Sequence, residues 1–442
     1  MSEQANIGNS VFTFDFSIFL HKNEPKAIPG KGAATSISKG SIQYLEIEDN
    51  LAQYGYVGNV TFSNFAGILD KLGLSGGTNK NSLLFDINIK SDDFNGKDPD
   101  NTTIKALVQL QDSADKIKNS IDRKLQFKFE ELQPAQLRQH NVDPTHPSLV
   151  KSKNIGEALI NTLTFDAGNG TTKGGTAKTE ETPKLVPGVI TNGDSYYDVS
   201  HKLYKLYYFK EHGPGLVQLA TKSSKRVFNI TALGEFVKDF IKAANGNSLS
   251  KWVIDGFTLA PLESNRQNDF RESSIEKFDL HKPQYEQLFR EKWLNYTVTQ
   301  HNERDVTTTK NNTITYQSLK EEFEKVVCGG KKSNLPARID TGGQDIKYTS
   351  LKSEFPIGDE NLNVTAMKNR TFKSFIYDNT AISFKVTGSP HRKPGFFIML
   401  NDTKKKNDEN ELTGYWYIIS VKHIFENDIY TNEIVAVKFF SM

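Results

Sequence analysis

One local motif could supply a nucleophilic serine for hydrolysis. It is the triplet Gly193-Asp194-Ser195. A Gly-Asp-Ser triplet can surround a reactive serine, but hydrolysis also needs a base and an orienting group within reach of that serine. The triplet ends a long polar stretch, and the sequence indicates no histidine partner for it. We therefore interpret it as a solvated turn.

Metal and phosphate sites would leave spacing patterns that this sequence does not contain. The nine histidines show no His-Glu-x-x-His motif, so a metal centre would need distant residues to converge; they include His140, His146, His201, His212 and His423. The acidic cluster at 92–100 lacks the terminal glutamate of a calcium loop, which favours an acidic turn. The glycine-rich stretch 168–175 lacks phosphate-loop spacing, because Lys173 precedes Gly174.

Cys328 is the only cysteine, which excludes an intramolecular disulfide and a zinc site built from cysteines. It follows a predicted helix over 319–327, where the helix dipole disfavours a thiolate, so an inert thiol is favoured. Lys404–Lys406 is interpreted as a solvated loop, with contact to DNA or an acidic partner as the alternative. Paired carboxylates for glycoside cleavage leave no spacing signal and stay open. The sequence therefore indicates no catalytic, cofactor-binding or metal-binding residue, and no cofactor.

Composition limits the class of protein. The 442 residues are enough for about two to four domains, and a content of 36% hydrophobic residues excludes wholesale disorder. The formal charge of +2 gives no argument for nucleic acid or anionic lipid as a partner. No secretory signal is indicated, and the longest apolar run, Phe396–Leu400, is too short for a membrane span. We expect synthesis in a cytoplasm and no membrane insertion.

The first 150 residues show the period-two alternation of antiparallel strands with one wet face. Turn-forming residues separate these runs, which indicates a small barrel or sandwich. The predicted strands are 11–18, 42–47, 56–62, 83–89 and 125–132.

Residues 151–260 have the pattern of an α+β domain. Helical spacing predicts a short helix over 149–163, and the stretch 166–195, rich in Gly and Thr and without aromatic residues, predicts a long loop. A second helix is predicted to start with Thr231 as its N-cap and to end at Asn245-Gly246, followed by a strand over 252–257.

Residues 261–375 read as a mixed α+β region, and 376–442 as a β-domain. In the mixed region, 293–298 predicts a strand, 319–327 a helix and 329–350 a loop. The last region contains four short strands with turn residues between them, which predicts a β-meander. Its aromatic strand, 415–424, carries large side chains on both faces, and we expect neighbouring domains to cover the exposed one.

Three segments at the C-terminus resemble the closing β-domain of baseplate hub proteins from contractile-tailed bacteriophages: Ala381–Gly388 (AISFKVTG), Pro394–Asp402 (PGFFIMLND) and Tyr415–His423 (YWYIISVKH). The preceding stretch Met367–Tyr377 is similar to the helix that leads into that domain. Residues 42–62 resemble the first β-domain of the family, and the helix 233–244 with the strand at Trp252 resembles its intervening domain. Similar β-domains occur in spike proteins of bacterial contractile injection systems.

The resemblance implies a β-rich α+β fold with two small tube-like antiparallel β-barrel domains, at 1–150 and 376–442, flanking α+β middle domains. Part of 261–375 would complete the second barrel. It implies a homotrimer whose six barrels match a sixfold tail tube to a threefold central spike. Expected partners are the spike protein, tube or tube-initiator proteins and a tape-measure protein. Genomic DNA would pass through the bore without specific binding, and the location would be the baseplate of the virion tail.

This reading predicts a non-enzymatic structural protein. Two alternatives belong to other classes. A tail-associated cell-wall hydrolase would use carboxylates brought together from distant segments. A carbohydrate-binding adhesin would expose the aromatic side chains of Tyr415, Trp416 and Tyr417.

Overall fold

The computed structural model describes residues 3–7, 10–21, 34–63, 82–91, 103–111, 125–143, 145–165, 182–185, 190, 193–222, 225–246, 249–259, 274–275, 277–293, 295–302, 305–337, 346–348, 362–402 and 412–442. The acidic turn at 92–100, the glycine-rich stretch 168–175, most of the predicted loop 166–195 and the lysine run 404–406 lie outside these residues. In the described part, no helix is long and apolar enough to cross a membrane.

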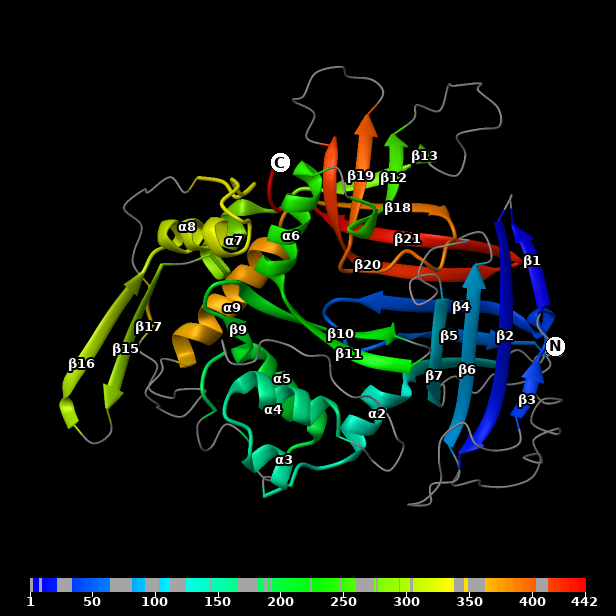
Figure 1. The fold of residues 1–442 in the computed structure, drawn as a ribbon, viewed down its shortest axis with the longest axis horizontal. Helices are drawn as coiled ribbons and strands as arrows, with labels where there is room; N and C mark the ends of the chain where they lie inside the picture. Colours follow the sequence, from blue (N-terminus) through cyan, green and yellow to red (C-terminus); the bar gives the residue numbers. More distant parts are fainter. Residues whose placement is uncertain are drawn as a thin grey trace.

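The described chain is a β-rich α+β protein, as the sequence predicts. Fifteen of its strands belong to one largely antiparallel sheet, and two three-stranded sheets accompany it. In Figure 1 the large sheet occupies the right and the top of the molecule, and the helices lie on the left. The N-terminal and C-terminal strands therefore lie together, although the helical segments separate them in the sequence.

The N-terminal strand group consists of β1–β8, hydrogen-bonded in the order β1-β2-β6-β7-β8-β5-β4, with β3 also paired to β2. The five predicted strands are present as β2, β4, β5, β6 and β8, whereas β1, β3 and β7 were not predicted. The apolar side chains of one face enter a single core. The bounds are β1 Glu3–Ile7, β2 Ser10–His21, β3 Ala34–Ile37, η1 Lys39–Ser41, β4 Ile42–Asn50, β5 Val57–Phe62, β6 Ser82–Ser91, β7 Thr103–Gln111 and β8 Leu125–Glu131.

The C-terminal strand group has a second core of its own. Its antiparallel order is β19-β20-β21-β18-β14, and β12 pairs in parallel with both β19 and β13. The bounds are β12 Val253–Leu259, β13 Ser274–Ile275, β14 Phe278–His281, β18 Ala381–Thr387, β19 Phe397–Asp402, β20 Gly414–Glu426 and β21 Ile429–Val437.

The predicted meander is wrong in its connectivity, because β18 pairs with β21 and not with β19. The segment 388–396 crosses the end of the group, and the resulting order is that of a Greek key. Pairing with β18 covers the edge of β21 that a meander would leave open.

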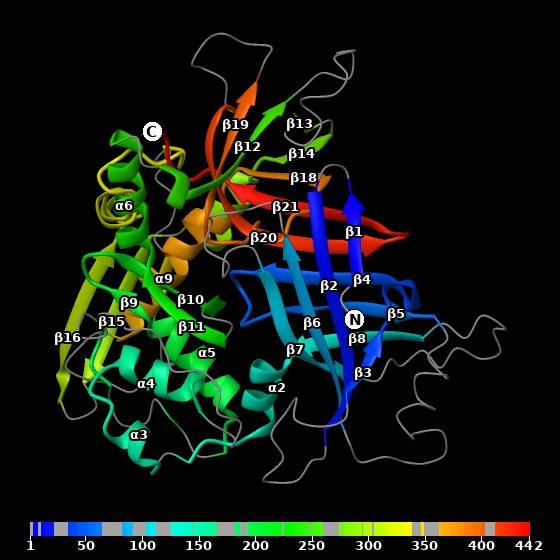
Figure 2. The ribbon, with the colours of Figure 1, turned by 45° about the vertical axis from the view of Figure 1, so that its right-hand side comes forward.

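Strand β20 belongs to both groups. Its first residues, Gly414–Tyr417, pair with β19. Its second half, Ser420–Glu426, pairs with β4 in seven antiparallel residue pairs. The opposite edge of β20 pairs with β21. Figures 1 and 2 both show β4 and β5 directly beside β20 and β21. We call the β4–β20 pairing the seam.

The middle of the chain packs helices against the small sheet β9-β10-β11. The single helix predicted over 149–163 is two helices, α3 and α4. Thr231 does not cap α6, because it belongs to β11, where it pairs with Leu216 of β10, and the N-cap position falls on Ala232. The bounds are α2 Leu132–Gln139, α3 Pro147–Val150, α4 Ile155–Leu163, α5 Tyr196–Leu206, β9 Tyr208–Phe209, β10 Gly213–Lys222, β11 Lys225–Ala232, α6 Leu233–Asn245 and η4 Leu249–Lys251.

The remaining elements surround an aromatic core that also contains residues of β19 and β20. Trp293, predicted to lie in a strand, instead follows α7 and is fully buried. The predicted loop 329–350 contains a short strand, β17, paired in parallel with β15. The bounds are α7 Tyr285–Glu291, β15 Tyr296–Asn302, β16 Asp305–Ile314, α8 Tyr316–Val326, β17 Ile346–Tyr348 and α9 Leu362–Tyr377.

Candidate functional site

The face of the sheet that crosses the seam is polar and carries charges of alternating sign. Lys385 of β18 lies directly opposite Glu433 of β21, Glu433 opposite Lys422 of β20, and Lys422 opposite Glu48 of β4. Directly opposed residues of an antiparallel sheet point to the same face. These four side chains therefore form a charge ladder across four strands and across the seam. We call this side of β18, β21, β20, β4, β5 and β8 the shared face.

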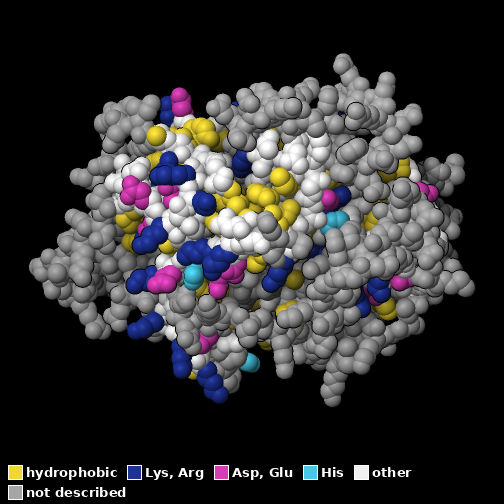
Figure 3. All heavy atoms as spheres, turned by 45° about the horizontal axis from the view of Figure 1, so that its top comes forward, with side chains coloured by type: hydrophobic (Ala, Val, Ile, Leu, Met, Phe, Trp, Pro, Cys, Tyr) yellow, Lys and Arg dark blue, Asp and Glu magenta, His cyan; other side chains and the backbone are white. Residues whose placement is uncertain are grey.

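The next row of the shared face is also polar and forms the floor of a groove. Glu46 lies opposite Asn59, Asn59 opposite Lys128, and Lys128 opposite Gln111. All four line a cavity of about 340 Å³, together with residues of α2 and α5. On the surface shown in Figure 3, charged side chains of both signs are intermixed.

Two aromatic side chains of the C-terminal group complete the core of the N-terminal group. Phe425 packs edge-on against Phe14 with ring centroids 5.2 Å apart, and Tyr430 packs edge-on against Phe12 at 5.4 Å. Phe425 and Tyr430 stack on each other at 4.2 Å, and Tyr430 is fully buried. The hairpin that carries them turns at Asn427-Asp428, where both residues have positive φ, as a two-residue hairpin turn requires.

A buried polar network fixes the crossing segment 388–396 beside the seam. The Oδ1 atom of Asn432 accepts hydrogen bonds from the Ser389 amide at 2.6 Å and from Nη1 of Arg392 at 3.1 Å. The Nδ2 atom of Asn432 lies 2.9 Å from Nδ1 of His423, and Oη of Tyr430 lies 2.8 Å from the same nitrogen. Burial, with a smaller effect of the nearby cations, lowers the pKa of His423 to about 3, so the ring is neutral.

A second buried network ties the N-terminal group to β11. Arg226 donates two hydrogen bonds to Glu131, from Nε at 2.5 Å and from Nη2 at 2.7 Å, and its guanidinium lies 4.4 Å from the ring centroid of Tyr56. Glu131 also accepts a hydrogen bond from the Tyr56 amide at 3.0 Å. Burial raises the pKa of the neighbouring Asp49 to about 6, although the charge of Arg226 opposes this rise.

The structure brings together a serine, a histidine and an aspartate that the sequence analysis did not group. The Oγ atom of Ser389 lies 2.5 Å from Nδ1 of His391, and Nε2 of His391 lies 3.8 Å from Oδ2 of Asp255. Asp255 instead accepts from Nε of Arg392 at 2.8 Å, and Ser389 is only 7% exposed. The long His391–Asp255 distance and the buried serine do not make a hydrolytic triad, which needs hydrogen-bond contact and substrate access.

The nucleophile candidates from the sequence have structural roles. Ser195 caps α5: its Oγ accepts from the Asp198 amide at 3.1 Å and donates to the Asp198 carboxylate at 2.6 Å. Asp194 pairs with Lys202 at 2.6 Å. Cys328 is fully buried after α8, and burial raises the pKa of its thiol well above the usual value.

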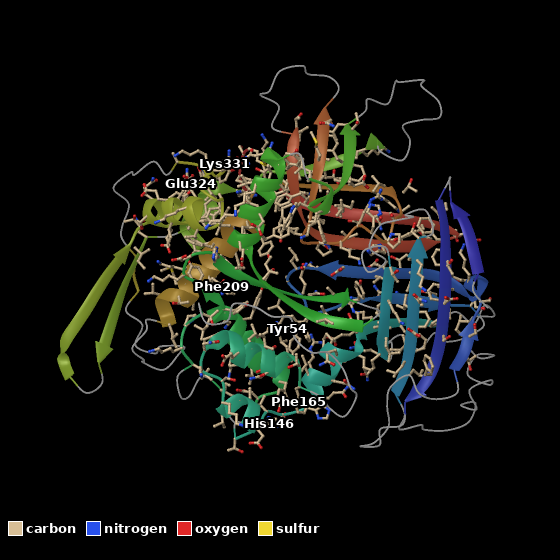
Figure 4. The ribbon with its side chains drawn as sticks, in the orientation of Figure 1. Tyr54, His146, Phe165, Phe209, Glu324 and Lys331 are labelled. Carbon is tan, nitrogen blue, oxygen red and sulfur yellow. The ribbon has the colours of Figure 1, made fainter. Side chains whose placement is uncertain are left out.

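The five histidines named above lie in different parts of the structure; His212 follows β9, and its carbonyl oxygen accepts a hydrogen bond from the Gly234 amide. His201 packs against Tyr54 and Tyr197, His140 against Phe165, and His423 belongs to the network at the seam. Figure 4 shows His146 far from Tyr54, at the outer end of the helical part. Among the described residues, no group of three or more His, Cys, Asp or Glu side chains could hold a metal ion.

The aromatic strand is covered within the chain, by a helix of the middle region, as expected for a strand with large side chains on both faces. Trp416 and Tyr417 are no more than 1% exposed. Helix α6 supplies the cover: Phe240 stacks on Phe397 with centroids 3.9 Å apart and packs edge-on against Tyr415 at 5.2 Å. An adhesin that binds sugars through these rings would need them accessible, so this arrangement disfavours the adhesin alternative.

Comparison with known proteins gives likeness of fold without likeness of sequence. No family model matches the chain. No curated protein matches it. The crystal structure of the tail protein from Neisseria meningitidis MC58 is similar with a TM-score of 0.51 and 10% identity, over 96% of each chain. The 43 kDa tail protein of prophage MuSo2 from Shewanella oneidensis gives a TM-score of 0.49, with 10% identity over 96% of this chain and 98% of that one.

A chain of a PdpA-VgrG complex is also similar, with a TM-score of 0.50 and 11% identity. The match covers 96% of this chain and 65% of the other. At these identities the likeness concerns the fold alone. The chain therefore has the fold of tail proteins, and the resemblance to baseplate hub proteins that its sequence indicated is confirmed at the level of the fold.

Proposed function

We propose that this chain is a structural subunit of the baseplate of a contractile phage tail, a hub that joins the sixfold tail tube to the threefold central spike. The observation that carries the proposal is the seam, because it fixes two strand groups with separate cores side by side in one chain. Three copies would present six such units, which is what an adaptor between a trimer and a hexamer needs.

The two strand groups fit the two barrels of this proposal. In the N-terminal group, side chains from β2 and β4, which are separated by β6, β7, β8 and β5 in the hydrogen-bonded order, meet in one core. In the C-terminal group, β13 pairs with β12 and β14 pairs with β18, with only 276–277 between β13 and β14. The shared core of the first group and the short connection between β13 and β14 in the second both support sheets that curve toward a closed barrel. The division at 150, 260 and 375 remains part of the proposal.

We assign the shared face to the bore. In its charge ladder, Lys385 and Lys422 each lie opposite a glutamate of the neighbouring strand, so this row offers few uncompensated cations to a phosphate backbone. Such a surface suits DNA that must slide past during ejection without specific binding. The partners in this proposal are two further copies of the chain, the spike protein, tube or tube-initiator proteins and a tape-measure protein. The chain would be made in the host cytoplasm and reside in the virion tail.

The solution mass and the shape of the assembled particle test the proposal. Mass photometry over a range of concentrations should reveal trimers, and negative-stain images should show rings with a pseudo-sixfold outline. Incubation with purified peptidoglycan should release no fragments, since the proposal includes no catalytic role. A protein that stays monomeric at high concentration and in the presence of its spike protein would overturn the trimer, and release of fragments would favour the hydrolase.

A further inference from the structure

Strands β15 and β16 form a hairpin that extends away from the rest of the molecule. Figures 1 and 2 both show it beyond the helices, at the end of the molecule opposite the N-terminal group. Among the described elements, β15 and β16 make extensive contacts only with each other, apart from the contact of β15 with β17. The 10 residues of β16 give the hairpin a length of about 30 Å.

The base of the hairpin is fixed to the aromatic core. Trp293 lies shortly before β15 and Tyr316 shortly after β16, and both are no more than 1% exposed. Their rings stack with centroids 6.1 Å apart. The Oδ1 atom of Asn295 accepts a hydrogen bond from the Tyr316 amide at 2.8 Å, which joins the two ends of the hairpin. The body of the protein therefore sets the direction in which the hairpin projects.

The sequence of the outer part of the hairpin provides no apolar face. Within the strands, the residues from Thr299 to Thr313 include one apolar residue, Val306, and the others are polar, with threonine the most frequent. Threonine favours the strand conformation, as β-branched residues do. A two-stranded hairpin without an apolar face is only marginally stable in water, so hydrogen bonds to a further strand would stabilise this one.

Both edges of the hairpin have a stretch of backbone without a strand partner in the part of the chain that the structure describes. Strand β16 pairs with β15 alone, so its whole outer edge is open there. Strand β17 pairs with β15 only from Tyr296 to Val298, which leaves Thr299–Asn302 open. Open strand edges are templates for pairing with another chain. The two open edges lie on opposite sides of the same two-stranded ribbon.

We propose that β16 of one copy of this chain pairs with the outer half of β15 of a second copy. This inference rests on the proposed function, because the trimer supplies the second copy. The two edges differ, so the interface is heterologous, and three copies close it into a ring when each is rotated by a third of a turn. Pairing of β16 with β16 would instead be twofold and would give dimers.

The proposed ring is antiparallel throughout. Strands β15 and β16 run in opposite directions within one chain, and a threefold rotation about an axis along the hairpins keeps this alternation between copies. Main-chain hydrogen bonds would supply the affinity, as they do when a strand is added to the edge of a sheet. A contact segment of this kind needs no apolar patch, which agrees with the sequence of the hairpin.

Removing the outer half of the hairpin tests the proposal. In the variant, Asn-Gly replaces residues 300–310, so Thr299 and Asn311, which already pair, flank a two-residue turn. We expect trimers of the wild type in mass photometry, and the variant should need a concentration at least about tenfold higher to form them. Its thermal midpoint as a monomer should equal that of the wild type. Thr308→Val keeps every backbone group and the β-branched shape, so this matched control should form trimers as the wild type does.

Hydrogen exchange of the full chain provides a second measurement that needs no variant. Amides of β16 and of Thr299–Asn302 should exchange at least about tenfold more slowly at concentrations where trimers form. A wild type that stays monomeric would overturn the trimer and this inference together. Three results would overturn this inference alone and leave the proposed hub standing: equal trimer formation by the shortened variant, dimers joined through β16, or protection of β16 only when the spike protein is added.

Discussion

Individual buried polar side chains connect strands and segments that are distant in the sequence. Arg226 and Glu131 link the N-terminal group to β11, and Arg392 links the crossing segment to Asp255 of β12 and Asn432 of β21. Each partner is more than 40 residues away or on another element, so the sequence contains no local pattern that pairs them. Their roles could be found only from the fold.

His423 should make the protein less stable in acid. Its folded pKa of about 3 lies below the ordinary value of 6.5, so the unfolded chain binds the extra proton between these two values. This contribution to stability is complete above about pH 6.5 and is lost as the pH falls toward 3, by up to about 1.4 kcal/mol per pH unit. In urea titrations from pH 7.5 to 4.5, His423→Gln should therefore lose less stability than the wild type.

The control for that series is His146→Gln, because His146 is exposed. Its pH profile should match that of the wild type. Parallel profiles for His423→Gln and the wild type would show that His423 carries no part of the acid sensitivity.

Removing one partner of the Arg226–Glu131 pair should destabilise the protein more than removing both partners. Arg226→Met leaves the carboxylate of Glu131 buried without its cation, and we expect a loss of about 3–5 kcal/mol in the free energy of unfolding. The double variant Arg226→Met with Glu131→Met removes both charges and should recover part of that loss. Equal losses for the single and double variants in chemical denaturation would contradict this account.

At the scale of elements, periodicity predicted most of the individual helices and strands. The helices over 233–245 and 319–327 and the four C-terminal strands are present, because the apolar residues of each element face a core: that of the helices in one case, and the second core of the C-terminal group in the other. Helix α2 could not be predicted from periodicity, since Leu132 continues the alternation of β8 and Pro134 does not indicate a helix by itself, although proline fits the first turn. Thr231 was misjudged because pairing with β10 extends β11 through it.

The hairpin of β20 and β21 should stabilise the N-terminal group more than its position in the sequence suggests. Tyr430→Ala removes a fully buried ring that packs against Phe12, and we expect a loss of about 3–5 kcal/mol. Hydrogen exchange should then become faster in β2 as well as in β21. Ile429→Ala is the matched control, because Ile429 is 59% exposed and should change stability by less than about 0.5 kcal/mol. Faster exchange confined to β21 would argue against a shared core.

At the scale of the whole molecule, the sequence could not predict the seam. Strands β4 and β20 lie more than 360 residues apart, and pairing between distant strands leaves no spacing pattern. The family resemblance implied two β-domains but did not indicate that they share a strand. That arrangement follows from the long β20, whose two halves have different partners on the same edge.

A fragment of residues 1–150 should not fold into a stable unit. It lacks β20, which pairs with β4, and it lacks Phe425 and Tyr430, which fill its core. The purified fragment should bind a hydrophobic dye and show broad thermal unfolding. Sharp, cooperative unfolding without dye binding would show that the N-terminal group is independent of the seam.

Side chains of β20 enter two cores, and its residues pair with β4 on one edge and β21 on the other. The number of residues in β20 must therefore fit both pairings. Side chains alternate between the two faces of a strand, so one residue inserted between Ser420 and Glu426 would turn apolar side chains outward on one side of the insertion. Elsewhere such an insertion would be absorbed by a loop or would damage one sheet. Here it would shift the pairing with β4 and with β21 together, so natural variants of this chain should preserve the spacing from Val421 to Phe425 even where the side chains differ.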